Sequence, residues 1–180
     1  MIYVFLAEGF ETVEALAPVD VMRRAGLEAV TVSISGGKTV TSRQNVTVSA
    51  DITLAEVDLR KARMLMLPGG MPGADNLYAC GELRDMLLAA SEKGVYIAAI
   101  CAAPYILGEL GILRGKKATC YPGYENRLKG AFPTGERVTY DRGVLTGAGM
   151  GTAVEFGLAA VALLSGYEEA ERISKAIIEK

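Results

Sequence analysis

Residues 95–104 read VYIAAICAAP, an apolar run that leads without a break into a helix-like segment. Cys101 lies at the junction, with small residues two positions before it (Ala99) and two positions after it (Ala103). A nucleophile elbow needs small residues at these positions, because the turn from strand to helix is too tight for bulky side chains. The stretch therefore predicts a strand, a sharp turn that carries the thiol, and a helix.

The chemistry of Cys101 has two interpretations. In the first, the unpaired N–H groups and the dipole of a helix N-terminus favour the thiolate and could also hold an oxyanion or an oxidised sulfur. In the second, Cys101 is a buried structural cysteine, which is a common role for this residue. Cys80 and Cys120 lie in less specific surroundings and are interpreted as structural thiols. Three unclustered cysteines indicate neither a disulfide framework nor a zinc site.

Strand-like and helix-like segments alternate on both sides of this stretch. Several of the strand-like runs are apolar at consecutive positions, which indicates strands covered on both faces, as in parallel sheets. The alternation predicts an α/β fold with a mostly parallel sheet and helices on both sides. Strands are expected at 2–7, 27–34, 63–67, 95–100, 117–121 and 144–146, and helices at about 14–25, 82–93, 102–110, 152–164 and 167–179.

Two segments depart from the simple alternation. Residues 36–51 begin with a Gly-Gly turn signal and contain two short β-like runs, which predicts a hairpin-like excursion at a sheet edge. The helix expected at 14–25 is apolar nearly all round, which predicts burial on more than one side. Its second cover is either another subunit or another element of the same chain.

Size and composition exclude several classes of function. A chain of 180 residues fits one domain, residues 1–180. The 19 basic and 21 acidic side chains give a net charge of -2, so no basic excess favours nucleic acid. The absence of histidine excludes Ser-His-Asp triads, Cys-His dyads and histidine-bound metals. No targeting segment and no apolar run of about 20 residues is present, so we expect a cytoplasmic protein that does not enter membranes.

Three further motifs lie where strands are expected to end. Gly69 and Gly70 follow the strand at 63–67, where they either form a turn or let N–H groups approach a ligand. The glycine-rich run at 147–151 indicates close backbone packing near a pocket rather than a nucleotide site. Glu11 and Glu14 follow the first strand and could simply favour a helix N-terminus.

Glu14 also has a functional interpretation, in which it lies against Cys101 across the carboxyl ends of the strands. A carboxylate beside a thiolate is repulsive, so the acid would be protonated and would donate a hydrogen bond. Such a pair could transfer protons without a histidine.

These motifs together resemble the ThiJ/PfpI superfamily and, within it, the DJ-one branch. The resemblance extends over nearly the whole chain in order and spacing. It implies a flavodoxin-like three-layer α/β/α sandwich that forms a homodimer and needs neither metal nor organic cofactor. The residues that carry it are Glu14 with 18–26, Leu67–Gly70, Ala98–Ala102, and Gly151-Thr152 leading to Glu155-Phe156.

The resemblance also assigns roles to residues. Cys101 corresponds to the elbow nucleophile and Glu14 to its protonated carboxylic partner, and Gly70 and Ala102 would supply backbone donors beside the sulfur. Arg43 matches a position near the pocket mouth that a second subunit often contributes.

One departure concerns the histidine that relatives carry about twenty residues after the elbow, just before a proline. Here Tyr121 precedes Pro122, and both are expected at the pocket. A phenol is a poor general base at neutral pH, though it can donate a hydrogen bond. The departure argues against histidine-dependent hydrolysis and leaves chemistry that needs only a thiolate and an acid.

Three functions remain open. The first is an enzyme for small reactive carbonyls, similar to glyoxalase III or a deglycase, with Cys101 as nucleophile. The second is an oxidative-stress sensor or chaperone, in which Cys101 is oxidised to sulfinic acid. The third is a structural or binding subunit with an inert thiol.

Overall fold

A central sheet organises the computed structural model, which describes residues 1–179. Within those residues the sheet has seven strands in the order β10–β11–β7–β6–β1–β2–β5. Neighbouring strands are parallel except for β10 and β11, which are antiparallel. The strands are β1 (Ile2–Leu6), β2 (Ala29–Ser33), β5 (Ile52–Thr53), β6 (Met64–Leu67), β7 (Tyr96–Ile100), β10 (Val138–Asp141) and β11 (Val144–Gly147).

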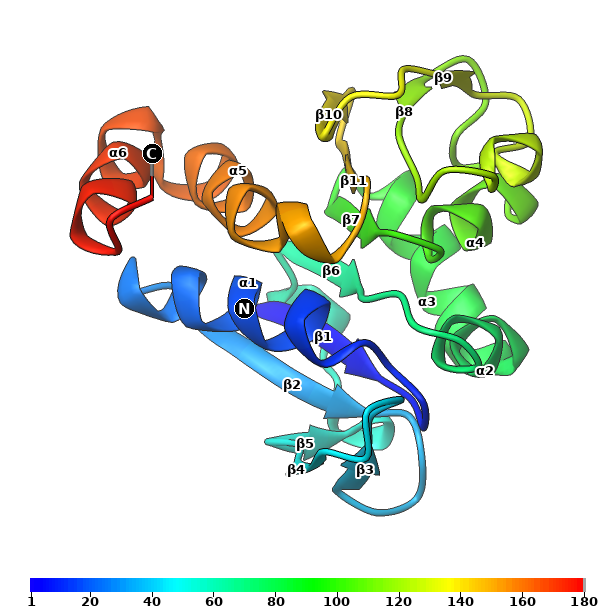
Figure 1. Cartoon of the computed structure of the whole chain (residues 1–180). Helices are drawn as coiled ribbons and strands as arrows, with labels where there is room; N and C mark the ends of the chain where they lie inside the picture. Colours follow the sequence, from blue (N-terminus) through cyan, green and yellow to red (C-terminus); the bar gives the residue numbers. More distant parts are fainter. Residues whose placement is uncertain (180) are drawn as a thin grey trace.

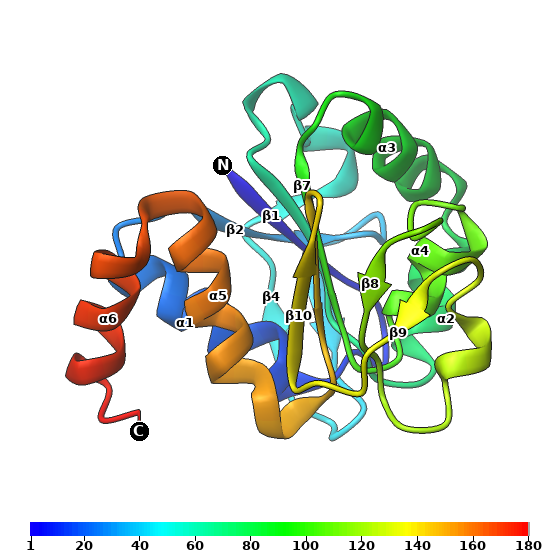
Figure 2. The same cartoon turned by 90° about the horizontal axis from the view of Figure 1, so that it is seen from above.

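Helices cover both faces of this sheet (Figures 1 and 2). Strand β1 shows why both faces need a cover, because all its residues are buried. Tyr3 and Phe5 point into the core under α2–α4, and Val4 points into the core under α1 and α5. The chain is therefore the three-layer α/β/α sandwich that the sequence predicted. The helices are α1 (Thr12–Arg24), α5 (Ala153–Ser165) and α6 (Tyr167–Ala176) on one face, and α2 (Gly73–Ala79), α3 (Gly81–Glu92) and α4 (Pro104–Glu109) on the other.

The predicted strand at 117–121 is wrong in length and place. Only β8 (Lys117–Ala118) is extended, and it pairs with β9 (Phe132–Pro133) outside the central sheet. The chain leaves the strand at Thr119, whose backbone N–H donates to the side chain of Thr146 rather than to a neighbouring strand.

Strands β5, β9 and β10 and helix α2 were not predicted. Helix α2 begins at Gly73, where a Cβ atom would lie 2.6 Å from the backbone nitrogen of Phe10. Glycine is a poor helix former, so at this position close packing against the loop after β1 overrides local propensity. Four 3₁₀ helices complete the described chain: η1 (Leu54–Glu56), η2 (Leu59–Lys61), η3 (Glu125–Arg127) and η4 (Met150–Thr152).

Helix α1 receives its second cover from α5 of the same chain. The two helices approach so closely that a Cβ atom on Gly157 would lie 3.0 Å from the Cα atom of Pro18. The apolar pattern of α1 is thus explained within one subunit. The homodimer implied by the sequence resemblance stays a prediction.

The excursion at 36–51 is the hairpin that the sequence predicted, formed by β3 (Thr39–Thr41) and β4 (Thr47–Ser49). Two backbone hydrogen bonds dock it onto the loop after β1. The N–H of Gly9 donates to the carbonyl of Thr41 over 2.8 Å, and the N–H of Arg43 donates to the carbonyl of Phe10 over 2.9 Å. The hairpin therefore brings Arg43 to the edge of the sheet where the parallel strands end.

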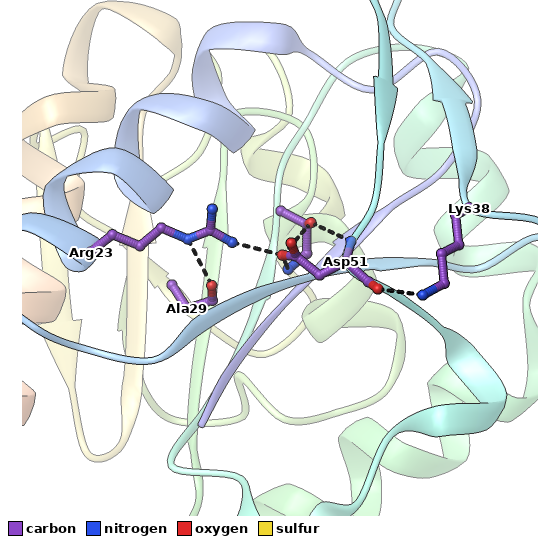
Figure 3. Close-up of polar contacts among 5 residues, drawn as sticks. Arg23, Ala29, Lys38 and Asp51 are labelled. Carbon is purple, nitrogen blue, oxygen red and sulfur yellow. Dashed lines mark hydrogen bonds and ion pairs between the residues drawn. The ribbon is translucent and has the colours of Figure 1, made fainter.

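Asp51 anchors the return of this hairpin to the sheet (Figure 3). Its Oδ2 atom accepts hydrogen bonds from the backbone N and the Oγ1 of Thr31 over 2.8 and 2.7 Å, and from Arg23 over 2.6 Å. The ammonium of Lys38 donates to the Asp51 carbonyl over 2.6 Å. Partial burial raises the pKa of Asp51, but the hydrogen bonds from Thr31 and the charge of Arg23 outweigh it, so the net pKa is lowered.

We expect Asp51→Ala to destabilise the protein by about 1–3 kcal/mol at pH 7, because Thr31 loses its acceptor. Thermal or urea unfolding measures the difference. A lowered pKa means that the charged Asp51 stabilises the fold above the ordinary pKa of an aspartate and that this contribution is lost as the pH falls through the lowered pKa. The difference between wild type and variant should therefore shrink in acid.

The matched control is Asp20→Ala. Asp20 forms an exposed i,i+4 ion pair with Arg24 on the same helix, and such pairs contribute about 0.5 kcal/mol or less. Equal destabilisation by the two substitutions would contradict an anchoring role for Asp51.

Candidate active site

Cys101 occupies a strained turn directly after β7. Its φ angle is +65°, a left-handed conformation that costs a non-glycine residue about 1–2 kcal/mol. Neighbouring backbone holds it on both sides: the Cys101 N–H donates to the carbonyl of Gly147 over 2.8 Å, and its carbonyl accepts from the N–H of Tyr121 over 2.8 Å. Strain that is held so firmly is typical of functional residues. The geometry agrees with the predicted elbow.

The helix after the elbow begins later than predicted. Residues 101–103 form turns, and α4 starts only at Pro104. The sulfur therefore lies before the first turn of α4, and individual N–H groups rather than a helix dipole act on it. The N–H groups of Ala102 and Gly70 both bond to the sulfur and lower its pKa, so both predicted backbone donors face the thiol.

Glu14 lies beside Cys101 and is 1% exposed. It comes from the first turn of α1, and its Oε2 accepts a hydrogen bond from the N–H of Gly69 over 2.9 Å. Gly69 separates the two side chains: a Cβ atom there would lie 2.6 Å from Glu14 Oε2 and 2.8 Å from the Cβ of Cys101. The predicted pair is thus brought together, and glycine is required between its members.

Burial raises the pKa of Glu14 to about 7, although hydrogen bonds from Cys101 and Gly69 partly oppose the increase. Burial, followed by the negative charge and the hydrogen bonding of Glu14, raises the pKa of Cys101 to about 12. The two groups therefore titrate as one unit that carries a single negative charge between these two values.

This result corrects the expectation of a thiolate stabilised at neutral pH. The N–H groups of Ala102 and Gly70 do lower the pKa of Cys101, but burial and the adjacent carboxylate outweigh them. The carboxylate of Glu14 is instead positioned to take the thiol proton as the sulfur attacks. Glu14 can therefore act as the general base that a histidine would otherwise provide.

A cavity of about 280 Å³ opens in front of the pair. Most of the predicted pocket residues line it, including Arg43 from the same chain. Pro122 does not: it is exposed and is not among the residues that line the cavity. The lining consists of Glu11, Glu14, Arg43, Gly70, Met71, Cys101, Ala102, Tyr121, Tyr124 and Met150.

Glu11, Met71, Tyr124 and Met150 were not predicted at the pocket. Met71 follows Gly70 and Met150 lies inside the glycine-rich run, so their positions were available as a signal. That run does pack near the pocket, as predicted: a Cβ atom on Gly149 would lie 3.9 Å from the Cys101 sulfur. Cys80 and Cys120 do not line the cavity.

Two features are absent from the part of the chain that the structure describes. Among residues 1–179, no group of three or more Cys, Asp and Glu side chains is arranged to hold a metal ion. In the same residues, no helix combines the length and the apolar composition needed to cross a bilayer.

A cysteine on a strained strand-to-helix turn, beside a buried carboxyl group at the carboxyl edge of a parallel sheet, defines an α/β protein of the nucleophile-elbow class. The family model of this class that matches is DJ-1/PfpI, over residues 1–163. The chain belongs to the DJ-1/PfpI family, which confirms the resemblance seen in the sequence.

Individual relatives match over almost the whole chain. Protein dj-1beta of Drosophila melanogaster is 33% identical over 97% of this chain and 95% of its own length. The Caenorhabditis elegans protein named glutathione-independent glyoxalase DJR-1.2 is 29% identical over 93% of this chain and 90% of its own. The solved structure of oxidized Toxoplasma gondii DJ-1 has a TM-score of 0.94, is 32% identical, and covers 98% of this chain and 97% of that one. Two relatives from Arabidopsis thaliana are longer, and this chain spans 40% and 45% of their length.

The paired titration gives a testable pH profile. We expect alkylation of Cys101 by iodoacetamide to rise with a midpoint near pH 7, where the pair loses its first proton. In Glu14→Gln the base is absent, so the midpoint should move above the free-cysteine value of about 8.5 and the rate at pH 7 should fall at least about tenfold. Mass spectrometry of the Cys101 peptide measures both.

Glu11→Gln is the control for this experiment. The negative charge of Glu11 raises the pKa of Glu14, so its removal should shift the midpoint slightly downward while keeping the base. A midpoint that stays near pH 7 in Glu14→Gln would contradict the role of Glu14 as proton acceptor, since glutamine can donate but cannot take a proton.

Proposed function

We propose that the protein is a cysteine-dependent enzyme that converts small 2-oxoaldehydes to 2-hydroxy acids, as glyoxalase III does. The observation that carries this proposal is the contact between Glu14 and Cys101 in a cavity of about 280 Å³. A relative named as a glutathione-independent glyoxalase supports the same assignment.

The first step is addition of the thiol to the aldehyde. The Cys101 sulfur forms a bond to the aldehyde carbon, its proton passes to the Glu14 carboxylate, and the carbonyl π electrons move to oxygen. The N–H groups of Gly70 and Ala102 bond to the sulfur, and in this proposal they also stabilise the developing oxyanion. Return of the proton from Glu14 to that oxygen completes a hemithioacetal.

The second step moves a proton between adjacent carbons. The Glu14 carboxylate removes the hydrogen of the former aldehyde carbon, which gives an enediolate with its negative charge on the second oxygen. The hydroxyl proton of the first carbon passes to that second oxygen, and Glu14 returns the carbon-derived proton to the neighbouring carbon, which gives a thioester of the 2-hydroxy acid. One carbon is oxidised and the other is reduced, so no external electron acceptor is needed. A pKa of about 7 suits this exchange, because Glu14 then gives and takes a proton with similar ease.

The last step is hydrolysis. Water adds to the thioester carbonyl, the carbon–sulfur bond breaks, and the sulfur takes a proton back, so the products are the free thiol and the hydroxy acid. Every step uses groups of the chain or water and requires no metal or organic cofactor.

Purified protein with methylglyoxal should form lactate. We expect Cys101→Ser and Glu14→Gln each to lower kcat/KM at least about 100-fold, because one removes the nucleophile and the other the proton carrier. Cys80→Ser should retain activity, because Cys80 lies outside the cavity. Chiral lactate analysis measures the product, and equal slow consumption of methylglyoxal by wild type and Cys101→Ser would exclude the enzyme function.

A second function, that of an oxidation sensor, has its own support. A solved relative at 32% identity is an oxidized form of Toxoplasma gondii DJ-1, and the N–H groups of Ala102 and Gly70 face the Cys101 sulfur. In this proposal two equivalents of peroxide convert the thiol to sulfenic and then sulfinic acid, with release of water at each step.

Mass spectrometry after mild peroxide treatment separates this function from unselective damage. We expect an increase of two oxygen atoms at Cys101 while Cys80 and Cys120 stay reduced. Scattered oxidation of all three cysteines would contradict a tuned sensor.

A further inference from the structure

Two tyrosines form one side of the cavity, which we name the aromatic wall (Tyr121 and Tyr124). Their ring centroids lie 6.4 Å apart with an interplanar angle of 82°, an edge-to-face pair. The wall lies next to the nucleophile, because the Tyr121 N–H donates to the carbonyl of Cys101 over 2.8 Å. Tyr121 is 51% exposed, so its ring has surface available for a ligand.

The aromatic wall is anchored to the core by Arg127. The guanidinium carbon of Arg127 lies 3.5 Å from the ring centroid of Tyr105 and 5.9 Å from that of Tyr124. Tyr105 is completely buried, and its hydroxyl donates to Asp75 over 2.7 Å. Arg127 therefore links a buried ring in the core to a ring of a residue that lines the cavity.

The backbone around Arg127 is equally constrained. A Cβ atom on Gly108 of α4 would lie 2.5 Å from the Arg127 carbonyl oxygen and 3.0 Å from the Cα of Leu128. This contact and the cation–π contact on Tyr105 hold the segment that carries the aromatic wall against α4, the helix that follows Cys101. A wall fixed in this way loses little conformational entropy when a ligand binds.

We propose that the aromatic wall makes the site selective for 2-oxoaldehydes that carry an aromatic substituent, and that Arg127 is the residue that positions it. The inference rests on the proposed function and names its substrate class. The carbonyl carbon would react with Cys101 while the aryl ring packs against Tyr121 and Tyr124.

Charge and size define the substituent further. Arg43 lines the same cavity together with the acids Glu11 and Glu14, so a charged substituent of either sign would meet a like charge, whereas a neutral ring would not. The cavity of about 280 Å³ lies just below the usual range of ligand pockets, roughly 300–1,000 Å³. The substituent is thus a single neutral ring rather than a peptide or a nucleotide.

Turnover of phenylglyoxal and methylglyoxal tests the substrate class. We expect the ratio of their kcat/KM values to fall about three- to tenfold in Tyr124→Leu, the effect of losing one aromatic contact. Arg127→Met should lower the ratio in the same direction, and Arg127→Lys should restore part of it, because lysine can keep a cation over the Tyr105 ring. A merely structural defect would lower both kcat/KM values together and leave their ratio unchanged.

Arg84→Met is the matched control. Arg84 forms a cation–π contact with Tyr78, with its guanidinium carbon 5.4 Å from the ring centroid, but neither residue lines the cavity. The ratio should not change in this variant. An equal fall in Arg84→Met and Arg127→Met would overturn the positioning role.

A second readout does not depend on turnover. Cys101 displaces bromide from 2-bromoacetophenone and from bromoacetone, and the ratio of the two alkylation rates is compared with that of glutathione. We expect the protein to favour the aryl ketone about threefold or more beyond glutathione, and Tyr124→Leu to lose this preference. A ratio equal to that of glutathione overturns the inference even if lactate forms. A retained preference without any turnover upholds the aryl site and rejects the proposed enzyme.

Discussion

The carboxyl group of Glu14 and the thiol of Cys101 can meet only because Gly69 has no side chain. A Cβ atom at that position would lie within 2.8 Å of both residues. Three strands bring the residues of this contact together: β1 leads into the helix that carries Glu14, β6 ends two residues before Gly69, and β7 ends directly before Cys101. These strands are adjacent and parallel, so their carboxyl ends meet at one edge of the sheet.

The strained turn and the buried acid that form this contact both lower the stability of the folded protein. The φ angle of Cys101 is strained, and the pKa of Glu14 rises from an ordinary 4.5 to about 7 in the folded state. The folded state therefore binds this proton more tightly than the unfolded chain does. It follows that stability falls as the pH rises from about 4.5 to about 7. Two fully buried cores, one on each face of the sheet, offset this loss.

The layers of the fold could be predicted from the sequence because β1, β6 and β7 carry apolar residues at consecutive positions, the pattern of a strand covered twice. The elbow at Cys101 was predictable from Ala99 and Ala103, and the pairing with Glu14 from where the strands end. Helix α2 was not predictable, because the loop that packs against Gly73 is distant in sequence. The ionisation of the Cys101 thiol was not predictable either. It depends on how deeply the thiol is buried and on the charge of the adjacent Glu14 carboxyl group.

The absence of histidine in the sequence changes how the site can transfer protons. With an imidazole and a carboxyl group, one residue can stay a base while the other stays an acid, and two pKa values then bound the activity. In this protein burial raises the pKa of Glu14 to about 7, and burial and the charge of Glu14 raise the pKa of the thiol, so the pair loses its first proton near pH 7. The same oxygen must then accept each proton and return it. Such chemistry suits a reaction in which a proton only changes its place on the substrate, and it is poorly suited to protonating an amine leaving group. The composition of the chain and the geometry of the pair thus both favour isomerisation of a carbonyl compound over peptide hydrolysis.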